Sequence, residues 1–201
     1  IASQPMQRWS LNVMRPWPAT ASGNRFIVIY QDHFSNWVEI FPLRKHTAEV
    51  VAQLLVGEIV KRYGAMERLH SDQGPEFESA LYQEVCRLWG ICKTRTSPYT
   101  PWSNGKLERV NQTVKQMVKH YVQSAPNTWD RFLFFVQMAY NFTEHASTGF
   151  TPFRLFFSRC GDPRLPLDLV YGRRKLSVSE VCPHLYCAEQ SAKAIKIFEI
   201  A

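Results

Sequence analysis

The chain has 201 residues, 45% of them hydrophobic and 13% aromatic, which suffices for the core of one domain of ordinary size. No apolar run reaches the ~18 residues that a membrane-spanning helix requires, and the formal net charge of +7 favours polyanionic partners, nucleic acid first. The five cysteines form neither a CxxC pair nor a zinc-knuckle spacing, so we expect reduced, mostly buried thiols in an intracellular protein of the nucleus or cytoplasm. The first residue is Ile, and we expect a fragment of a longer protein.

The first part of the chain predicts three strands in succession. Residues 9–14 alternate apolar and polar side chains, which is typical of a half-buried strand, and Pro16 and Pro18 end it. Residues 26–30 are apolar on both faces, which predicts a strand inside a sheet, and residues 37–41 predict a third strand. Because the connections are short, we expect these strands to pair antiparallel.

The second part alternates helices and strands. Thr47 is expected to cap the start of a helix that Gly64 ends. The elements predicted after it are a strand at 66–70, a helix at 78–90, a strand at 91–94, a loop at 97–105, helices at 106–123 and 128–143, a short helix opened by Thr151 and Pro152, an irregular segment at 158–174 and a final helix at 177–199. This order predicts an α/β fold with a five-stranded mixed sheet flanked by helices.

Two long segments carry the most specific motifs. One runs from Leu69 to Phe77 around Asp72, the other runs from Pro98 to Arg109 around Glu108, and 35 residues lie between the two acids. With shorter segments at 32–37 and 148–153, they resemble the catalytic core of retroviral and LTR-retrotransposon (Ty3/gypsy-like) integrases over roughly residues 5–172. The resemblance implies a ribonuclease-H-like core at residues 1–157, followed by a C-terminal extension at 158–201.

The resemblance also implies a metal site with one departure. Integrases of this kind cleave and join phosphodiester bonds with two Mg²⁺ or Mn²⁺ ions about 3.5–4 Å apart, held by anionic oxygen ligands. The matching positions are Asn12, Asp72 and Glu108, with Asn12 where the family has aspartate. Losing one anionic bridge weakens metal binding by roughly several kcal/mol on Coulomb grounds. We therefore expect that the triad is vestigial and that the chain has little or no integrase activity. We expect no resident cofactor, and any metal ion that does bind should lie at Asp72 and Glu108.

Other residues near this site have ordinary explanations as well. Arg15 stands where the family usually has glycine, and its charge would further oppose a metal ion. Asp32 is predicted roughly across a hairpin from Asn12, but is interpreted as a structural hydrogen-bonding residue. Asp72 can also be explained as an aspartate that stabilises a turn beside a glycine. Glu108 can be explained as an acidic residue in the first turn of a helix, where the helix dipole favours negative charge. The two motifs and their spacing favour descent from a catalytic site over these explanations.

Basic and aromatic residues around Glu108 suggest contacts with nucleic acid. In the family, the helix after the glutamate contacts DNA phosphates, and lysines there supply salt-sensitive affinity. The residues concerned here are Lys106, Arg109, Gln112, Lys115 and Lys119. An ordinary solvated helix face explains them equally well. Trp102, where the family usually has glutamine, can stack on a base, stiffen its loop or meet a partner chain.

Three functional hypotheses follow. The first is a host-domesticated, non-catalytic integrase core that binds DNA or RNA, dimerises, or does both, with no membrane contact. The second is an active or weakly active strand-transfer enzyme in which Asn12 is tolerated. The third is a dimerisation scaffold without a nucleic-acid role. A homodimer is expected from the resemblance and from the apolar residues in 128–143.

Overall fold

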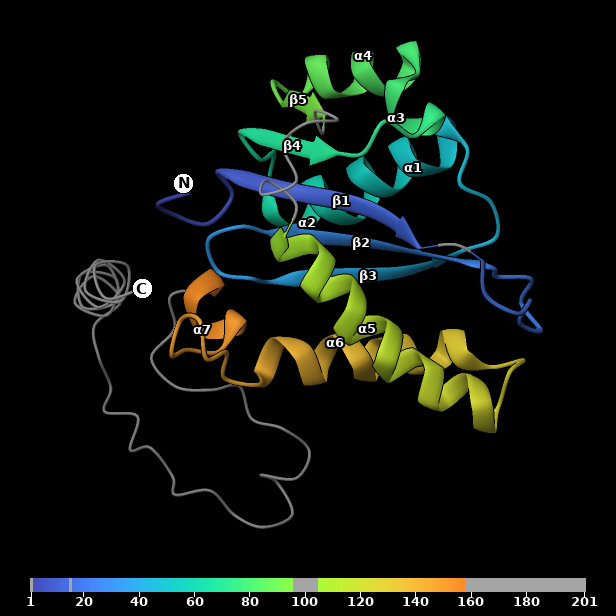
Figure 1. Ribbon diagram of the computed structural model, residues 1–201. Coiled ribbons are helices and arrows are strands. Elements are labelled where there is room, and N and C mark those ends of the chain that lie inside the picture. The colour runs from blue at the N-terminus through green and yellow to red at the C-terminus, as the bar shows by residue number, and fades with distance from the viewer. Residues whose placement is uncertain (1, 15, 96–104, 158–201) are drawn as a thin grey trace, which may run out of the picture.

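The structure is a computed structural model that describes residues 2–14, 16–95 and 105–157. Its centre is a five-stranded sheet with the strand order β3-β2-β1-β4-β5 (Figure 1). The strands are β1 (Arg8–Met14), β2 (Phe26–Asp32), β3 (Val38–Leu43), β4 (Arg68–Ser71) and β5 (Cys92–Arg95). β1, β2 and β3 pair antiparallel, whereas β4 pairs parallel with β1 and β5 pairs parallel with β4. The predicted five-stranded mixed sheet is therefore confirmed.

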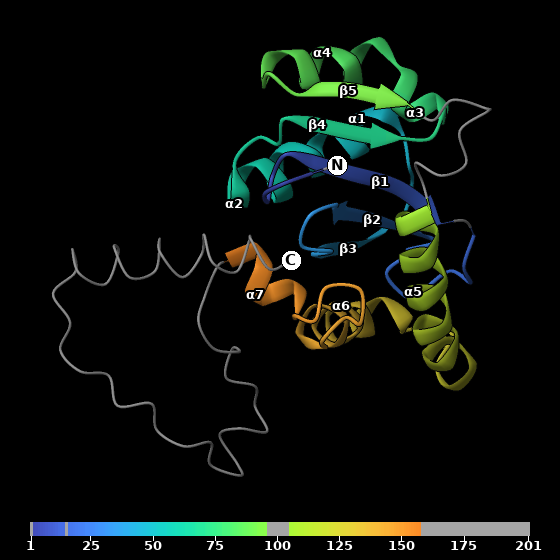
Figure 2. The ribbon, with the colours of Figure 1, turned by 60° about the vertical axis from the view of Figure 1, so that its left-hand side comes forward.

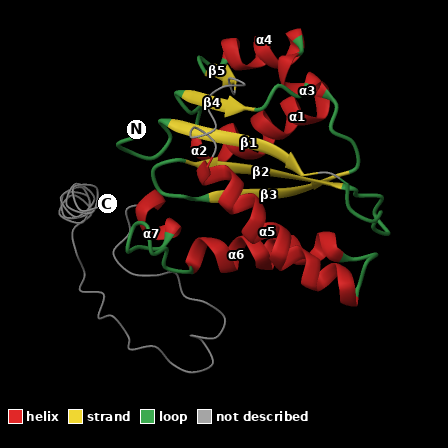
Figure 3. Cartoon of the chain, in the orientation of Figure 1, coloured by secondary structure: helices red, strands yellow, loops and turns green. Residues whose placement is uncertain are grey.

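Helices cover both faces of this sheet (Figure 3). They are α1 (Ala48–Leu54), the π-helical segment η1 (Leu55–Val60), α2 (Lys61–Tyr63), α3 (Pro75–Glu78), α4 (Ala80–Leu88), α5 (Gly105–Ser124), the 3-10 turn η3 (Trp129–Phe132), α6 (Leu133–Phe142) and α7 (Pro152–Phe157). Turning the molecule shows α5 and α6 on the side of the sheet away from α1 and α4 (Figure 2). Within the described residues, no helix is long and apolar enough to cross a membrane.

Two hydrophobic clusters hold these layers together. The first joins Trp9, Leu11 and Val13 of β1 to residues of α1, η1 and α4. The second joins Met14 and β2 to α5 and α6. Because successive residues of a strand point to opposite faces, β1 contributes alternate side chains to the two clusters. The alternation predicted for residues 9–14 is confirmed, but the strand is not half-buried as predicted, because Ser10 and Met14 on the second face are buried as well.

Several predicted helices are real but differ in detail. The helix predicted at 78–90 is α4 alone, with α3 as a separate turn before it, because Ser79 is extended (φ −64°, ψ 146°) and its side chain accepts a hydrogen bond from the Tyr82 amide. The helix after Thr47 runs to Gly64 (φ +84°) through the π-helical segment η1. The helix predicted at 128–143 starts with the 3-10 turn η3.

Some predictions cannot be compared with the structure. The irregular segment 158–174, the helix at 177–199, most of the loop at 97–105 and three of the cysteines lie outside the described residues. The division at residue 157 therefore stays a prediction. Of the two cysteines within the described residues, both are free, and Cys86 is buried as expected whereas Cys92 is exposed.

The edge strand β3 is covered by amide side chains of α6. The Asn141 side chain accepts a hydrogen bond from the Val38 amide at 2.9 Å and donates one to the Val38 carbonyl at 2.8 Å. The Gln137 side chain accepts from the Ile40 amide at 2.8 Å. These contacts satisfy backbone groups that an open edge would offer to another strand. They also fix α6 against the sheet on the side where α5 lies.

Candidate functional site

Two of the predicted triad residues lie next to each other at the carboxyl ends of neighbouring strands. In the parallel pairing of β1 with β4, Leu11 is the register partner of Ser71, so Asn12 and Asp72 take the next positions along the chain. Leu11 belongs to the first hydrophobic cluster, so Asn12 faces the other side of the sheet, with Met14. Met14 packs there in one cluster with Val110 and Val114 of α5.

A tight turn holds the carboxylate of Asp72. Its Oδ1 atom accepts a hydrogen bond from the Gly74 amide at 3.0 Å. A Cβ atom at Gly74 would lie 3.1 Å from that oxygen and 3.0 Å from the carboxyl group of Glu76, so a larger residue here would need both carboxylates to move by a few tenths of an ångström. The turn chemistry that explains Asp72 structurally is therefore present, and it leaves the second oxygen of this half-buried side chain to other contacts.

Lys93 is a cation close to this turn. Its ammonium group donates to Ser71 Oγ at 2.6 Å and to the Thr94 carbonyl at 3.1 Å. Burial lowers the pKa of Lys93, and the nearby carboxylates of Glu78 and Asp72 act in the opposite direction. The strand end next to Asp72 thus already carries a positive charge that balances part of its negative charge.

Glu108 lies in the first turn of α5, on the same side of the sheet as Asn12. Its exposed side chain lines a groove of about 560 Å³ between α5 and the segment that follows β1. We call this the α5 groove; its walls are Met14, Pro16 and Trp17 on one side and Glu108, Asn111, Gln112, Lys115 and Lys119 on the other. Figure 1 shows α5 starting in front of the sheet and running across it. Met14 connects the groove to Asn12, two residues earlier on the same face of β1.

The donor atoms at these positions can be compared with what a metal centre requires. Asp72 and Glu108 supply carboxylates, and Asn12 supplies an uncharged amide oxygen. Within the described residues, no group of three or more His, Cys, Asp or Glu side chains is placed to hold a metal ion. Two carboxylates and one amide fit a single hard divalent cation better than a closely spaced pair, because a pair needs more negative charge.

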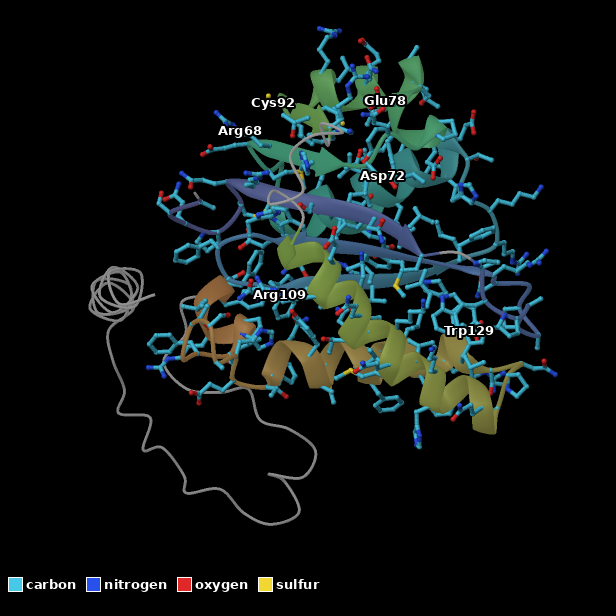
Figure 4. The ribbon with its side chains drawn as sticks, viewed as in Figure 1. Arg68, Asp72, Glu78, Cys92, Arg109 and Trp129 are labelled. Atoms are coloured by element: carbon cyan, nitrogen blue, oxygen red, sulfur yellow. The ribbon has the colours of Figure 1, made fainter. Side chains whose placement is uncertain are left out.

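The predicted nucleic-acid-binding residues divide between two sides of α5. Gln112, Lys115 and Lys119 are exposed and line the α5 groove together with Glu108. Arg109 does not share this face: it lines a separate cavity of about 340 Å³ with Gln31 and Tyr140, and Figure 4 labels it on α5. Successive residues of a helix are about 100° apart, which places Arg109 beside the groove's edge and not in it. Trp102 and the side chain of Lys106 lie outside the described part of the chain.

The position predicted for Asp32 was wrong, whereas its structural role is present. Asn12 pairs with Ile29, and Asp32 pairs with Trp9, so the residue across from Asn12 lies three positions before Asp32 in the chain. The buried Asp32 carboxylate accepts from the amides of Met6 at 3.1 Å, Phe34 at 3.2 Å and Ser35 at 2.8 Å. Burial raises the pKa of Asp32, and these hydrogen bonds oppose that rise. Asp32 therefore holds the turn after β2 together and lies away from Asn12.

Sequence reasoning missed two residues near the site. His70 is buried one strand position before Ser71, with its Nδ1 atom 3.0 Å from Thr94 Oγ1. Burial, helped by Arg8 and Lys93, lowers the pKa of His70. Trp17 lines the α5 groove, and its place between two prolines directly after a strand was the available signal. A fixed aromatic ring beside lysines is typical of nucleic-acid-binding surfaces.

The chain is similar to known proteins in sequence. Residues 2–101 match the family described as integrase core domain. The Gag-Pol polyprotein of baboon endogenous virus (strain M7) is 32% identical over 164 residues, which are 81% of this chain and 9% of that polyprotein. The chain thus corresponds to a small part of its relative's length.

Solved structures of integrases share the fold. The catalytic core domain of BIV integrase is 27% identical with a TM-score of 0.62, over 76% of this chain and 94% of that one. The HTLV-2 integrase catalytic core domain in complex with magnesium, in its trimeric form, has a TM-score of 0.61 at 21% identity, over 76% of this chain and 97% of that one. At that identity the second likeness shows the fold alone. The predicted ribonuclease-H-like fold is confirmed by these catalytic cores. Residues 2–101 therefore match the integrase core domain family, and the chain is similar to a part of retroviral Pol polyproteins.

Proposed function

We propose that this chain is an integrase-derived core that binds nucleic acid through the α5 groove and no longer carries out metal-dependent strand transfer. The observation that carries the proposal is Asn12, which lies beside Asp72 at the carboxyl end of β1 where the family has a metal-bridging aspartate. A host-domesticated origin is consistent with such a loss.

The loss of charge explains why catalysis would stop. Two unit charges about 4 Å apart interact with about 4 kcal/mol at the effective dielectric constant near a protein surface. An amide at position 12 gives up that interaction with each ion it would bridge. The ammonium group of Lys93, whose charge interacts with Asp72, opposes a second cation further.

Nucleic-acid binding rests on the charges that remain. Lys115 and Lys119 are exposed one helical turn apart and line the same groove, and the whole chain carries a net charge of +7. Lysines placed in this way attract phosphates through counterion release, without sequence preference. Binding of this kind does not require Asn12, Asp72 or Glu108 to hold a metal ion.

A homodimer is part of the same proposal. Phe134 and Phe135 of α6 are 65% and 52% exposed although they follow a buried tryptophan, Trp129. Two adjacent exposed phenylalanines on one helix are typical of a surface that another chain covers. The predicted dimer surface at 128–143 agrees with this exposure, and sedimentation of the chain at several concentrations tests it: a dimer that Phe135→Lys disrupts is expected, and a concentration-independent monomer would exclude it.

The test of lost catalysis is a strand-transfer and disintegration assay in Mn²⁺. We expect no product from the unmodified chain, and detectable product from Asn12→Asp if the remaining site is intact. Glu108→Gln in the Asn12→Asp background serves as the matched control and should abolish that product. Activity of the unmodified chain that Glu108→Gln removes would instead establish the alternative, an active metal-dependent strand-transfer enzyme.

A further inference from the structure

The α5 groove has a different character at its two ends. Glu108 lies at one end and Lys119 lies 11 residues further along α5, which corresponds to about 16 Å along the helix axis. Lys115 lies between them, one turn before Lys119. Negative charge is thus confined to the end near Asn12 and Asp72, whereas the far end carries two cations.

Trp17 forms the wall opposite these lysines, and several contacts hold it in place. Its amide donates to the Arg25 carbonyl at 2.9 Å, and its ring packs against Trp129 with the ring centroids 6.2 Å apart. Trp129 is fully buried near the second half of α5 and donates from its indole nitrogen to the Pro18 carbonyl at 2.8 Å (Figure 4). Pro16 and Pro18, which restrict the backbone, flank the tryptophan.

The loop that carries Trp17 is also tied to η3. Asp130 accepts hydrogen bonds from Thr20 Oγ1 at 3.0 Å and from the Asn24 side chain at 2.8 Å. The Ala21 amide donates to the Asn127 carbonyl at 2.8 Å. The indole of Trp17 is therefore preorganised: it is partly buried against Trp129, and its remaining surface lines the groove.

From this arrangement we propose that the α5 groove holds a single strand of nucleic acid, with one base stacked on Trp17 and the adjoining phosphates on Lys115 and Lys119. The inference rests on the proposed function and names the form of its ligand. A base inside a duplex has both faces covered by its neighbours, so only an unpaired base can lie flat on an indole that lines a groove. A volume of about 560 Å³ accommodates a nucleotide, since it falls within the usual range of ligand sites.

The proposal separates two contributions to binding. Stacking on an aromatic ring depends on the ring and little on salt, whereas phosphate contacts depend strongly on salt. Trp17 should therefore set affinity for unpaired bases without changing the salt dependence. Lys115 and Lys119 should set the salt dependence, because each phosphate contact contributes about 0.7 to the slope of log affinity against log salt for a single strand.

The experiment measures binding of a labelled oligo-dT and of a hairpin duplex of equal phosphate number by fluorescence anisotropy, together with quenching of tryptophan emission. The 201-residue chain is compared with Trp17→Ala, Trp17→Phe and Lys115→Ala. Trp89→Ala is the matched control, because Trp89 is an exposed tryptophan that follows α4 on the other side of the sheet.

The expected result has three parts. The unmodified chain binds the single strand more tightly than the duplex, and Trp17→Ala weakens single-strand binding on the order of ten-fold. Trp17→Phe keeps most of the affinity but loses the quenching, which a packing role alone would not predict. Lys115→Ala lowers the salt slope by about 0.7, whereas Trp17→Phe and Trp89→Ala leave it unchanged.

Other results overturn the inference in distinguishable ways. Equal quenching in Trp17→Phe and the unmodified chain, or tighter binding of the duplex, removes the stacking proposal and leaves nucleic-acid binding by the lysines intact. No salt-dependent binding of either ligand removes the proposed function as well. Should Trp17→Ala fail to fold, as judged by circular dichroism, Trp17→Phe alone decides.

Discussion

The two faces of β1 differ in composition and in role: one is apolar and packs in the core, and the other is largely polar and contributes to the candidate site. Trp9, Leu11 and Val13 point into the first hydrophobic cluster and are buried against α1, η1 and α4. Ser10 and Asn12 point the other way, where His70 of β4 and Asp72, directly after β4, continue the same polar row. One strand thus holds the fold together with alternate residues and presents the candidate site with the others. Substitutions on one face should change stability, and those on the other should change chemistry.

The largest expected effect compares neighbours on this strand. Leu11→Ala leaves a cavity in a fully buried position and should cost about 2–5 kcal/mol of the free energy of unfolding. Asn12→Ala removes a half-buried polar side chain and should cost below about 1 kcal/mol. Urea denaturation of both variants measures the difference. Similar losses in the two would show that the polar face is also structural.

A second comparison concerns the covered edge of the sheet. Asn141→Ala leaves the amide and carbonyl of Val38 without their side-chain partner and should cost about 2–3 kcal/mol. Thr143→Ala, on an exposed residue just after α6, is the control and should change stability by about 0.5 kcal/mol or less. Hydrogen exchange of the Val38 amide should accelerate only in Asn141→Ala. An unchanged exchange rate would mean that α6 does not protect this edge.

The smallest expected effect is a dependence of stability on pH. Burial lowers the pKa of His145, whose ring contacts Tyr140, while the hydrogen bond to the Tyr140 carbonyl acts in the opposite direction; Arg109 and Glu144 line the same cavity. Because the folded state binds this proton less well than the unfolded state, stability should fall as the pH drops below the ordinary histidine value of about 6.5. In His145→Gln, the midpoint of urea unfolding should change less between pH 7 and pH 5 than it does in the unmodified chain. If the midpoint depends on pH equally in His145→Gln and in the unmodified chain, other groups cause the loss of stability at low pH.

The sequence predicted the parts of this molecule that depend on periodicity and on motifs. All five strands were expected within a few residues, because alternation at residues 9–14 and apolar runs such as 26–30 are local signals. The hairpin offset that separates Asp32 from Asn12 was missed, since it depends on the path of residues 16–25. The separate turn α3 was missed because one extended residue, Ser79, interrupts an otherwise helical pattern.

The candidate site was predictable only in part for the same reason. Spacing identified Asp72 and Glu108, but the side of α5 on which Arg109 lies, and the role of Trp17 as a groove wall, depend on how α5 packs against the segment after β1. These are tertiary contacts between residues some 100 positions apart, such as the one between Trp129 and Pro18. No local pattern contains that information.

The central claim is that residue 12 decides whether this site holds metal. Calorimetric titration with Mn²⁺ measures metal binding directly. It compares the unmodified chain with Asn12→Asp, and each of these with the same chain carrying Glu108→Gln as well. We expect Asn12→Asp to bind Mn²⁺ at least about a hundred-fold more tightly, since a hundred-fold change corresponds to about 2.7 kcal/mol and the restored charge contributes about 4 kcal/mol for each ion. Tight binding of two Mn²⁺ ions by the unmodified chain, equal to that of Asn12→Asp and lost in Glu108→Gln, would contradict the account.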